Sequence, residues 1–159
     1  MTRRGDPIVI RRAAGTDAAE IAGCVAEAYR YYIHRLGHPP GPMLEDYGQV
    51  IVEREVFVAE FGHQIVGVLV LTQTEEGFLL DNIAVIPKHH GEGIGRRLLE
   101  LAEEQAKSAG FGSIYLTTHE KMTENQALYA RMGYTEYTRR IEKGFSRVYM
   151  RKLLTDDAV

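Results

Sequence analysis

Three alternating glycines, followed by a helical stretch, could form a binding site for a diphosphate. Gly91, Gly93 and Gly95 leave no Cβ in the turn, so the backbone can adopt positive φ and direct successive N–H groups into one concavity. The amphipathic helix predicted from residue 94 adds the positive end of its dipole and its unpaired first-turn N–H groups. Phosphates bind at such a combination. A glycine-rich connection with no ligand is the alternative interpretation.

The spacing of the residues distinguishes between three kinds of phosphate-binding loop. A P-loop requires a Lys-Ser/Thr pair, which residues 91–97 lack. The dinucleotide fingerprint Gly-x-Gly-x-x-Gly begins at Gly91 but has Arg96 at its third glycine position. The pattern that fits is x-x-Gly-x-Gly leading into a helix, over His90-Gly91-Glu92-Gly93-Ile94-Gly95.

In these residues the chain resembles the GNAT superfamily of acetyl-coenzyme A-dependent N-acetyltransferases. The family's loop, Gln/Arg-x-x-Gly-x-Gly/Ala, binds the diphosphate of coenzyme A (CoA), and the resemblance covers nearly the whole chain. His90 occupies the Gln/Arg position, a departure that we expect to be tolerated because backbone makes most of the contacts. The resemblance implies acetyl-CoA as co-substrate. The residues that it implies for coenzyme binding are Ile83, Ala84, Val85, His90, Gly91, Glu92, Gly93, Ile94, Gly95, Arg96, Asn125 and Tyr129.

A second stretch, residues 125–134, resembles the family's motif in which a tyrosine lies near the coenzyme sulfur. The resemblance implies that Tyr129 is the general acid that protonates the leaving thiolate. The usual pattern has an asparagine seven residues earlier, where this chain has Met122, so we expect Asn125 to contact the coenzyme instead. Packing in the core is the alternative role for Tyr129.

The base that deprotonates the amine has several candidates. Strand alternation places Asp81 on the same face as Leu79, where the histone-modifying branch of the family has a glutamate. Asp81 could accept the amine proton directly or through water, or bind the ammonium group. His119 is a second candidate, because imidazole titrates near neutral pH, and Glu120 is a third. Many relatives use only ordered water, which leaves the alternative of no dedicated base.

An aromatic segment after the first predicted helix could contact the substrate, because tyrosine rings can hold a cationic amine. The predicted substrate-binding residues are Tyr29, Tyr32, His34 and Asp81. The alternative is that some of these tyrosines are core residues and the rest are surface residues. His34 and His38 have the i, i+4 spacing of metal ligands on a helix, but Gly37 and the nearby prolines disfavour a helix, and no metal site is predicted.

An α/β (α+β) fold must position these residues. The hydrophobic pattern predicts strands over residues 8–11, 55–60, 65–71, 78–86, 113–118, 134–140 and 145–153. The resemblance implies a central mixed sheet of about seven strands, flanked by about four helices, with the fourth and fifth strands parallel but splayed apart at one end. Backbone groups of Ile83 and Val85 in this splay would bind the pantetheine arm as a pseudo-strand.

The predicted helices begin at recognisable residues. Thr16 or Asp17 could cap the first, which Gly37 ends, and Thr123 could cap the last. A short helix is expected over residues 43–52, and one over residues 94–109 should face inward with Leu98, Leu101, Ala102, Gln105 and Ala109.

Composition limits the class of protein. The chain has 159 residues, 45% of them hydrophobic, and is expected to form one domain over residues 1–159. Its net charge of −3 disfavours binding to nucleic acid. The basic residues within 139–152 are a solvated strand face or, alternatively, contact an acidic partner or a coenzyme phosphate.

The cysteine count and the distribution of apolar residues predict the cellular compartment. The single cysteine, Cys24, excludes an internal disulfide and indicates a reducing compartment and a role as a small core residue. Residues 1–4 are not followed by an apolar segment, and no run of 18 apolar residues occurs. We therefore expect a cytoplasmic protein that does not interact with membranes.

The sequence thus predicts an enzyme, an N-acetyltransferase that transfers the acetyl group of acetyl-CoA to a primary amine of a small molecule or peptide by direct attack in a ternary complex. A non-catalytic acyl-CoA-binding sensor or regulatory module is the alternative, kept open by Leu79 and Met122. A dinucleotide-binding enzyme is a more distant alternative. Because homodimers are common among relatives, a second copy of the chain is a candidate partner.

Overall fold

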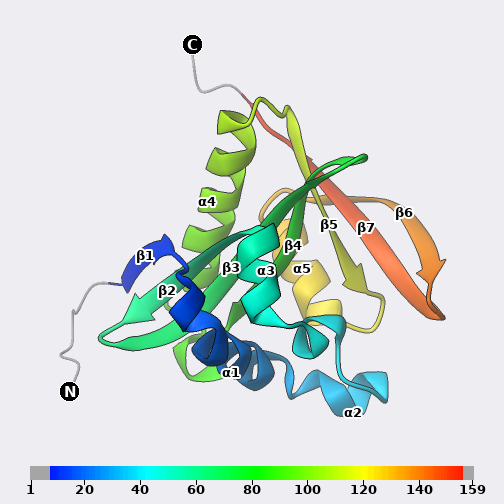
Figure 1. Ribbon diagram of the computed structural model, residues 1–159. Helices are drawn as coiled ribbons and strands as arrows, with labels where there is room; N and C mark the ends of the chain where they lie inside the picture. Colours follow the sequence, from blue (N-terminus) through cyan, green and yellow to red (C-terminus); the bar gives the residue numbers. More distant parts are fainter. Residues whose placement is uncertain (1–7, 156–159) are drawn as a thin grey trace. The chain divides into compact units, whose positions relative to one another are not determined.

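The computed structural model describes residues 8–155, which divide into two compact units (Figure 1). Unit 1 contains the described residues up to Leu71 together with Asn82–Leu99. Unit 2 contains Thr72–Asp81 and the described residues from Glu100 onward. Residues 1–4, on which the expectation of no secretory signal rests, lie outside the described residues.

Seven strands form one mixed sheet in the order β1-β2-β3-β4-β5-β7-β6. Their bounds are β1 (Ile8–Arg12), β2 (Glu55–Phe61), β3 (Gln64–Thr74), β4 (Gly77–Val85), β5 (Ser113–His119), β6 (Thr135–Glu142) and β7 (Phe145–Leu153). Strands β4 and β5 are parallel, and their pairing comprises only Leu79 with Tyr115 and Leu80 with Leu116, although both strands continue further. The predicted mixed sheet with a splay between the fourth and fifth strands is confirmed.

The described residues contain five α-helices, one more than expected. They are α1 (Ala18–Tyr29), α2 (Tyr32–Leu36), α3 (Tyr47–Glu53), α4 (Ile94–Ser108) and α5 (Thr123–Arg131). The additional helix arises because the first predicted helix is interrupted by a turn before α2. Gly37, with φ 82°, ends α2 as predicted. None of the helices in the described part of the chain is both long and apolar enough to cross a membrane.

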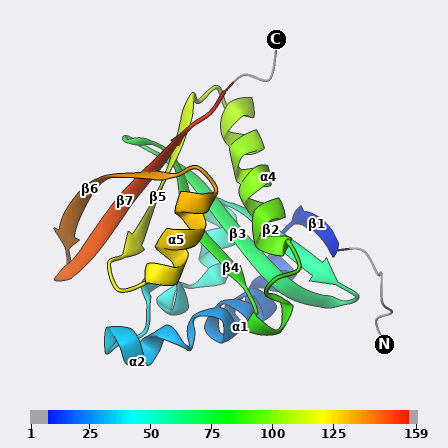
Figure 2. The ribbon, with the colours of Figure 1, turned by 180° about the vertical axis from the view of Figure 1, so that it is seen from behind.

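Unit 1 has helices on both faces of its strands. Helices α1 and α3 cover one face and the first turns of α4 cover the other (Figures 1 and 2). A Cβ at Gly67 of β3 would lie 3.2 Å from side-chain atoms of Ile94 and Leu98, so glycine permits the close approach of α4. Cys24 of α1 is buried as predicted, and burial raises the pKa of its thiol to about 12.

Unit 2 is built on β5, β7 and β6, with α5 packed on one face of these strands (Figure 2). The side chains buried on this face include Ile114, Leu116, Val148 and Met150. The opposite face carries the alternating residues of the same strands, among them Tyr115, His119, Arg147 and Tyr149.

Two further sequence predictions about helices are wrong. Helix α4 buries Ile94, Leu98, Leu99, Ala102 and Ala106, whereas Ala109 is exposed beyond its end. Thr123 is the first residue of α5 and does not cap it; Met122 occupies the N-cap and makes no side-chain capping bond.

Candidate functional site

The glycine loop of unit 1 connects β4 to α4. After β4, the Ile86 N–H donates to the Val66 carbonyl at 3.0 Å, and a short 3-10 turn, η3 (Pro87–His89), follows. Gly91 and Gly93 have φ of 81° and 82°, which confirms the left-handed backbone predicted for these two glycines. Gly95 instead lies in the first turn of α4.

The surface of this loop is open at all three glycines. A Cβ built at Gly91, Gly93 or Gly95 would meet no other heavy atom within 4 Å. At Gly95 the φ is not positive either, so neither backbone conformation nor packing within the chain requires glycine there. No other atom of the chain crowds the three glycine positions, and this open cradle at the beginning of α4 fits a diphosphate.

Two histidines hold the loop in place. His89 is buried against Phe61, with ring centroids 5.0 Å apart, and its Nδ1 lies 2.8 Å from Oε1 of Glu92. The ring of His90 is exposed, and its Nε2 lies 2.8 Å from the Val85 carbonyl oxygen. Thus Glu92 and His90, both predicted to bind the coenzyme, also make contacts that stabilise the loop.

The end of β4 presents backbone groups on the side away from β3. Because the N–H of Ile86 bonds to β3, strand alternation directs the N–H and C=O groups of Ile83 and Val85 away from β3. The Ile83 carbonyl accepts a hydrogen bond from the Tyr29 hydroxyl at 2.9 Å, and the Val85 carbonyl is the partner of His90. Ala84, between them, has a buried side chain.

A buried polar network connects helices α1 and α3 with β4. The Tyr29 hydroxyl lies 2.8 Å from Oδ1 of Asn82, and Nδ2 of Asn82 donates to the Tyr47 hydroxyl at 3.2 Å. Tyr47 in turn donates to the Pro42 carbonyl at 2.6 Å. Asn82 and Tyr47 were not predicted as important, although a polar residue on the apolar face of a predicted strand is a readable signal. The predicted contact of Tyr29 with a substrate stays a prediction.

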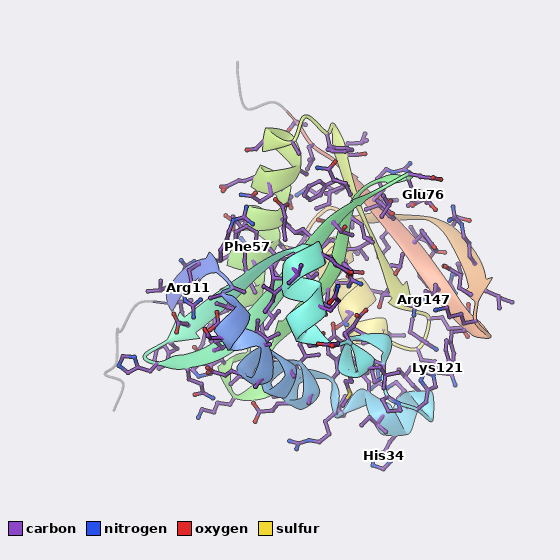
Figure 3. The ribbon with its side chains drawn as sticks, viewed as in Figure 1. Arg11, His34, Phe57, Glu76, Lys121 and Arg147 are labelled. Carbon is purple, nitrogen blue, oxygen red and sulfur yellow. The ribbon has the colours of Figure 1, made fainter. Side chains whose placement is uncertain are left out.

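Helix α2 carries the other predicted substrate-binding residues of unit 1. Tyr32 is buried, with its ring 6.3 Å from that of Tyr29, and Arg35 lies 5.4 Å above it. His34 is exposed on α2 and projects outward (Figure 3). Within residues 8–155, no three or more His, Cys, Asp or Glu side chains are grouped as metal ligands.

Unit 2 contains the predicted general acid. Tyr129 is buried on α5, and its ring centroid lies 6.0 Å from that of Tyr134. The hydroxyl of Tyr134 is buried without a hydrogen-bond partner among the described residues. Burial, and to a smaller extent the charge of Glu103, holds the pKa of Tyr134 far above its usual value. Asn125 is half-buried one helical turn before Tyr129.

The two leading candidates for the base also lie in unit 2, and one of them has a defined tautomer. Asp81 is half-exposed on β4. At the end of β5, Nδ1 of His119 accepts the backbone N–H of Lys121 at 3.0 Å. Neutral His119 therefore carries its proton on Nε2, which makes Nε2 a hydrogen-bond donor. This arrangement is less suited to proton abstraction than the sequence suggested.

Gln126 is a residue that sequence reasoning missed. Its side-chain Nε2 donates to the carbonyls of His119 and Glu120 at 3.1 and 3.0 Å. It thereby joins α5 to the end of β5. Nothing in the local sequence pattern marks it, because its acceptors become neighbours only through the fold of the loop.

The comparisons with known proteins define the class. A model of the acetyltransferase (GNAT) domain matches residues 53–136, and the chain belongs to this family. An uncharacterized N-acetyltransferase of Chlorobaculum tepidum is 30% identical over 99 residues, covering 60% of this chain. The match spans about 61% of the length of that relative.

Solved structures share the fold. The PaiA N-acetyltransferase of Thermoplasma acidophilum, solved in complex with coenzyme A, has a TM-score of 0.77 at 19% identity, covering 92% of this chain and 99% of that chain. A GNAT-family protein of Desulfovibrio desulfuricans has a TM-score of 0.76 at 17% identity, covering 94% of this chain and 100% of that chain. At such identities the likeness establishes the fold alone.

Proposed function

We propose that this protein is an acetyl-CoA-dependent N-acetyltransferase that acetylates a primary amine of a small molecule or peptide in a ternary complex. The observation that carries the proposal is the open cradle of backbone amides at Gly91, Gly93 and Gly95, where the chain itself has no need of glycine at the last position. Membership of the GNAT family supports it, as does the coenzyme A bound to the Thermoplasma relative.

In this proposal, backbone groups do most of the coenzyme binding. The N–H groups over residues 91–96 bind the diphosphate, and Arg96, exposed on α4, adds a positive charge. Ile83 and Val85 donate their N–H groups to the pantetheine amides, since their carbonyls already accept bonds from Tyr29 and His90. Asn125 is the proposed coenzyme contact on α5.

The bound acetyl-CoA supplies an activated thioester, and side chains of the protein handle the protons. Acetyl transfer forms a C–N bond and breaks the C–S bond, and the ammonium form of the acceptor loses two protons in all. We assign to Asp81 the acceptance, directly or through water, of the proton lost before attack, which is finally released to solvent. We assign to Tyr129 the donation of a proton to the leaving thiolate, and the second proton of the amine then restores the Tyr129 hydroxyl. An alkylamine with a pKa of about 10.4 is mostly protonated at neutral pH, so its deprotonation is a necessary step.

The test combines binding and turnover. Calorimetry with acetyl-CoA should show binding, and a thiol-release assay over polyamines, amino acids, aminoglycosides and N-terminal peptides should show turnover with at least one amine. Binding without turnover across the whole panel would favour the non-catalytic acyl-CoA module. Absence of binding would contradict both functions.

A further inference from the structure

The arginines on the face of unit 2 opposite α5 differ in their partners. Arg147 of β7 lies directly opposite His119 of β5 on one side and Arg140 of β6 on the other. Residues opposite one another in antiparallel strands share a face, so these three side chains form a row across the sheet (Figure 3 labels Arg147). Two adjacent arginines in such a row repel unless anions compensate them.

Arg140 has its compensation within unit 2. Its Nη1 lies 2.6 Å from Oε1 of Glu76, and its guanidinium lies 4.3 Å above the ring of Tyr149. Glu142, the carboxylate on the neighbouring part of β6, accepts a hydrogen bond from the Tyr149 hydroxyl. The carboxylates of Glu76 and Glu142 thus already have partners.

Arg147 has no such compensation. Its side chain is half-buried, and within the part of the chain that the structure describes it makes no side-chain hydrogen bond or ion pair. A guanidinium that is partly removed from water without a counterion is unfavourable, and an arriving anion would restore the balance. The planar fork of arginine matches a carboxylate with two parallel hydrogen bonds.

The neighbour of Arg147 on β5 is a histidine with a defined tautomer. Since Nδ1 of His119 accepts the Lys121 N–H, the proton of neutral His119 resides on Nε2. Phe145, two residues before Arg147 on the same face of β7, lies with its ring centroid 6.3 Å from that of His119. An arginine fork, an imidazole N–H and an aromatic wall are therefore grouped at one end of β5 and β7.

The proposed base lies on the same side of the sheet. Leu79 of β4 pairs with Tyr115, which pairs with Arg151 of β7, so Asp81 shares this face with Arg147. In the sheet order β5 lies between β4 and β7, and Asp81 directly follows the last residue of β4 that pairs with β5, at the beginning of the splay.

We propose that the acceptor is a small amine that also bears a carboxylate, such as an amino acid, and that Arg147 binds this carboxylate. The inference rests on the proposed N-acetyltransferase function and specifies its substrate class. Asp81 takes the amine end and Arg147 the anionic end of the same molecule.

The first experiment compares amino acids with their carboxamides as acceptors. The carboxamide has the less basic amine, so more of it is neutral, and intrinsic reactivity favours it at a fixed pH. A higher kcat/KM for the free acids, by about tenfold or more, would therefore report recognition of the carboxylate. Equal or higher kcat/KM for the carboxamides would overturn the proposal.

The second experiment compares variants of Arg147 that remove or keep its positive charge with a control variant that loses the same charge elsewhere. Arg147→Gln should raise KM for the amino acids about 10- to 100-fold with little change in kcat or in the kinetics of the carboxamides. Arg147→Lys should recover part of the loss, because the charge remains without the fork. Arg12→Gln is the control: Arg12 of β1 pairs with Glu55 and takes no part in the proposed site, so the kinetics of its variant should match the wild type. An unchanged KM in Arg147→Gln would overturn the proposal.

Binding measurements distinguish a failure of this inference from a failure of the proposed N-acetyltransferase function. Calorimetry of amino acids with the CoA-loaded protein should show binding that Arg147→Gln weakens, with circular dichroism confirming that the variant is folded. Transfer to amines without preference for a carboxylate would leave the N-acetyltransferase function intact and overturn the carboxylate site. Carboxylate binding that depends on Arg147, without transfer to any amine, would support the site and contradict the acetyltransferase function.

Discussion

Two tyrosines five residues apart differ in what their hydroxyl groups do. Tyr129 is the proposed general acid, whereas the hydroxyl of Tyr134 is buried without a partner among the described residues. Tyr129→Phe keeps the ring and removes the proton donor, so kcat should fall by about 10²–10⁴-fold with the affinity for acetyl-CoA unchanged. Steady-state kinetics and calorimetry measure the two quantities.

Tyr134→Phe is the matched control for this change. Because the lost hydroxyl bonds to nothing in the described chain, kcat should be unchanged and the free energy of unfolding should stay equal or rise by about 1 kcal/mol. A kcat for Tyr129→Phe that equals the wild-type value would remove Tyr129 from the role of acid and return it to the core-packing alternative.

Tyr29 has a structural role that can be separated from a role in substrate binding. Its hydroxyl is shared between Asn82 Oδ1 and the Ile83 carbonyl. Tyr29→Phe leaves these buried acceptors without their donor and should lower the free energy of unfolding by about 1–3 kcal/mol in urea titrations. Tyr31→Phe, at an exposed tyrosine, should change it by about 0.5 kcal/mol or less. A stable Tyr29→Phe variant with a raised KM for the amine would instead support direct substrate contact.

The sequence predicts the placement of a residue where that placement depends on the local pattern of the strand. It does not predict a placement that depends on the register between strands. The alternation of β4 correctly separated Asp81 from Asn82, because side chains along a strand point to opposite faces. The sequence marks Arg147 only as one of the basic residues within 139–152. Its position opposite His119 depends on how β7 pairs with β5, and the partners of Arg140 depend on the β3–β4 turn, neither of which a local pattern contains.

At the scale of the element, the beginning of α4 affects both the stability of the fold and the proposed binding of the diphosphate. Mutations can separate these two effects. Gly95→Ala removes a flexible residue from a helix where φ is not positive and space is open, so it should raise the free energy of unfolding by about 0.4–1 kcal/mol. The same methyl group would intrude on the proposed diphosphate site and should weaken acetyl-CoA binding about tenfold or more. Urea denaturation and calorimetry check the two effects.

Gly93→Ala provides the contrast. At φ of 82° an alanine is strained, which should lower the free energy of unfolding by about 1–2 kcal/mol while also weakening binding. Loss of binding in both variants, despite opposite effects on stability, would attribute the loss to the loop surface. A stabilised Gly95→Ala that binds acetyl-CoA as tightly as the wild type would place the diphosphate elsewhere.

Element types were more predictable than element boundaries and faces. Every predicted strand is present, since runs of apolar residues between turn signals are a strong local pattern. The predicted inward face of α4 is wrong at its C-terminal end, because Gly110 predicts a helix that continues to Ala109, whereas the helix ends at Ser108. The first helix was expected to run on to Gly37, since nothing in the composition of residues 30–31 resembles a helix breaker.

At the scale of the whole molecule, the chain crosses between the two units several times. Strands β3 and β4 and helix α4 each begin in one unit and end in the other. Unfolding one unit would leave these elements half-formed, with the backbone hydrogen bonds of α4 broken in its middle. We therefore expect residues 1–159 to unfold in one cooperative transition, as the prediction of a single domain requires.

Hydrogen exchange measured separately on β2 and on β7 tests this expectation, because β2 belongs to unit 1 and β7 to unit 2. Their slowest amides should report the same free energy of opening. A ligand that binds only the folded chain adds RT ln(1 + [L]/Kd), so acetyl-CoA at a hundred times its Kd should raise both values by about 2.7 kcal/mol. An increase confined to β2 would show that the unit carrying the glycine loop unfolds independently, and the chain would then contain two folding domains.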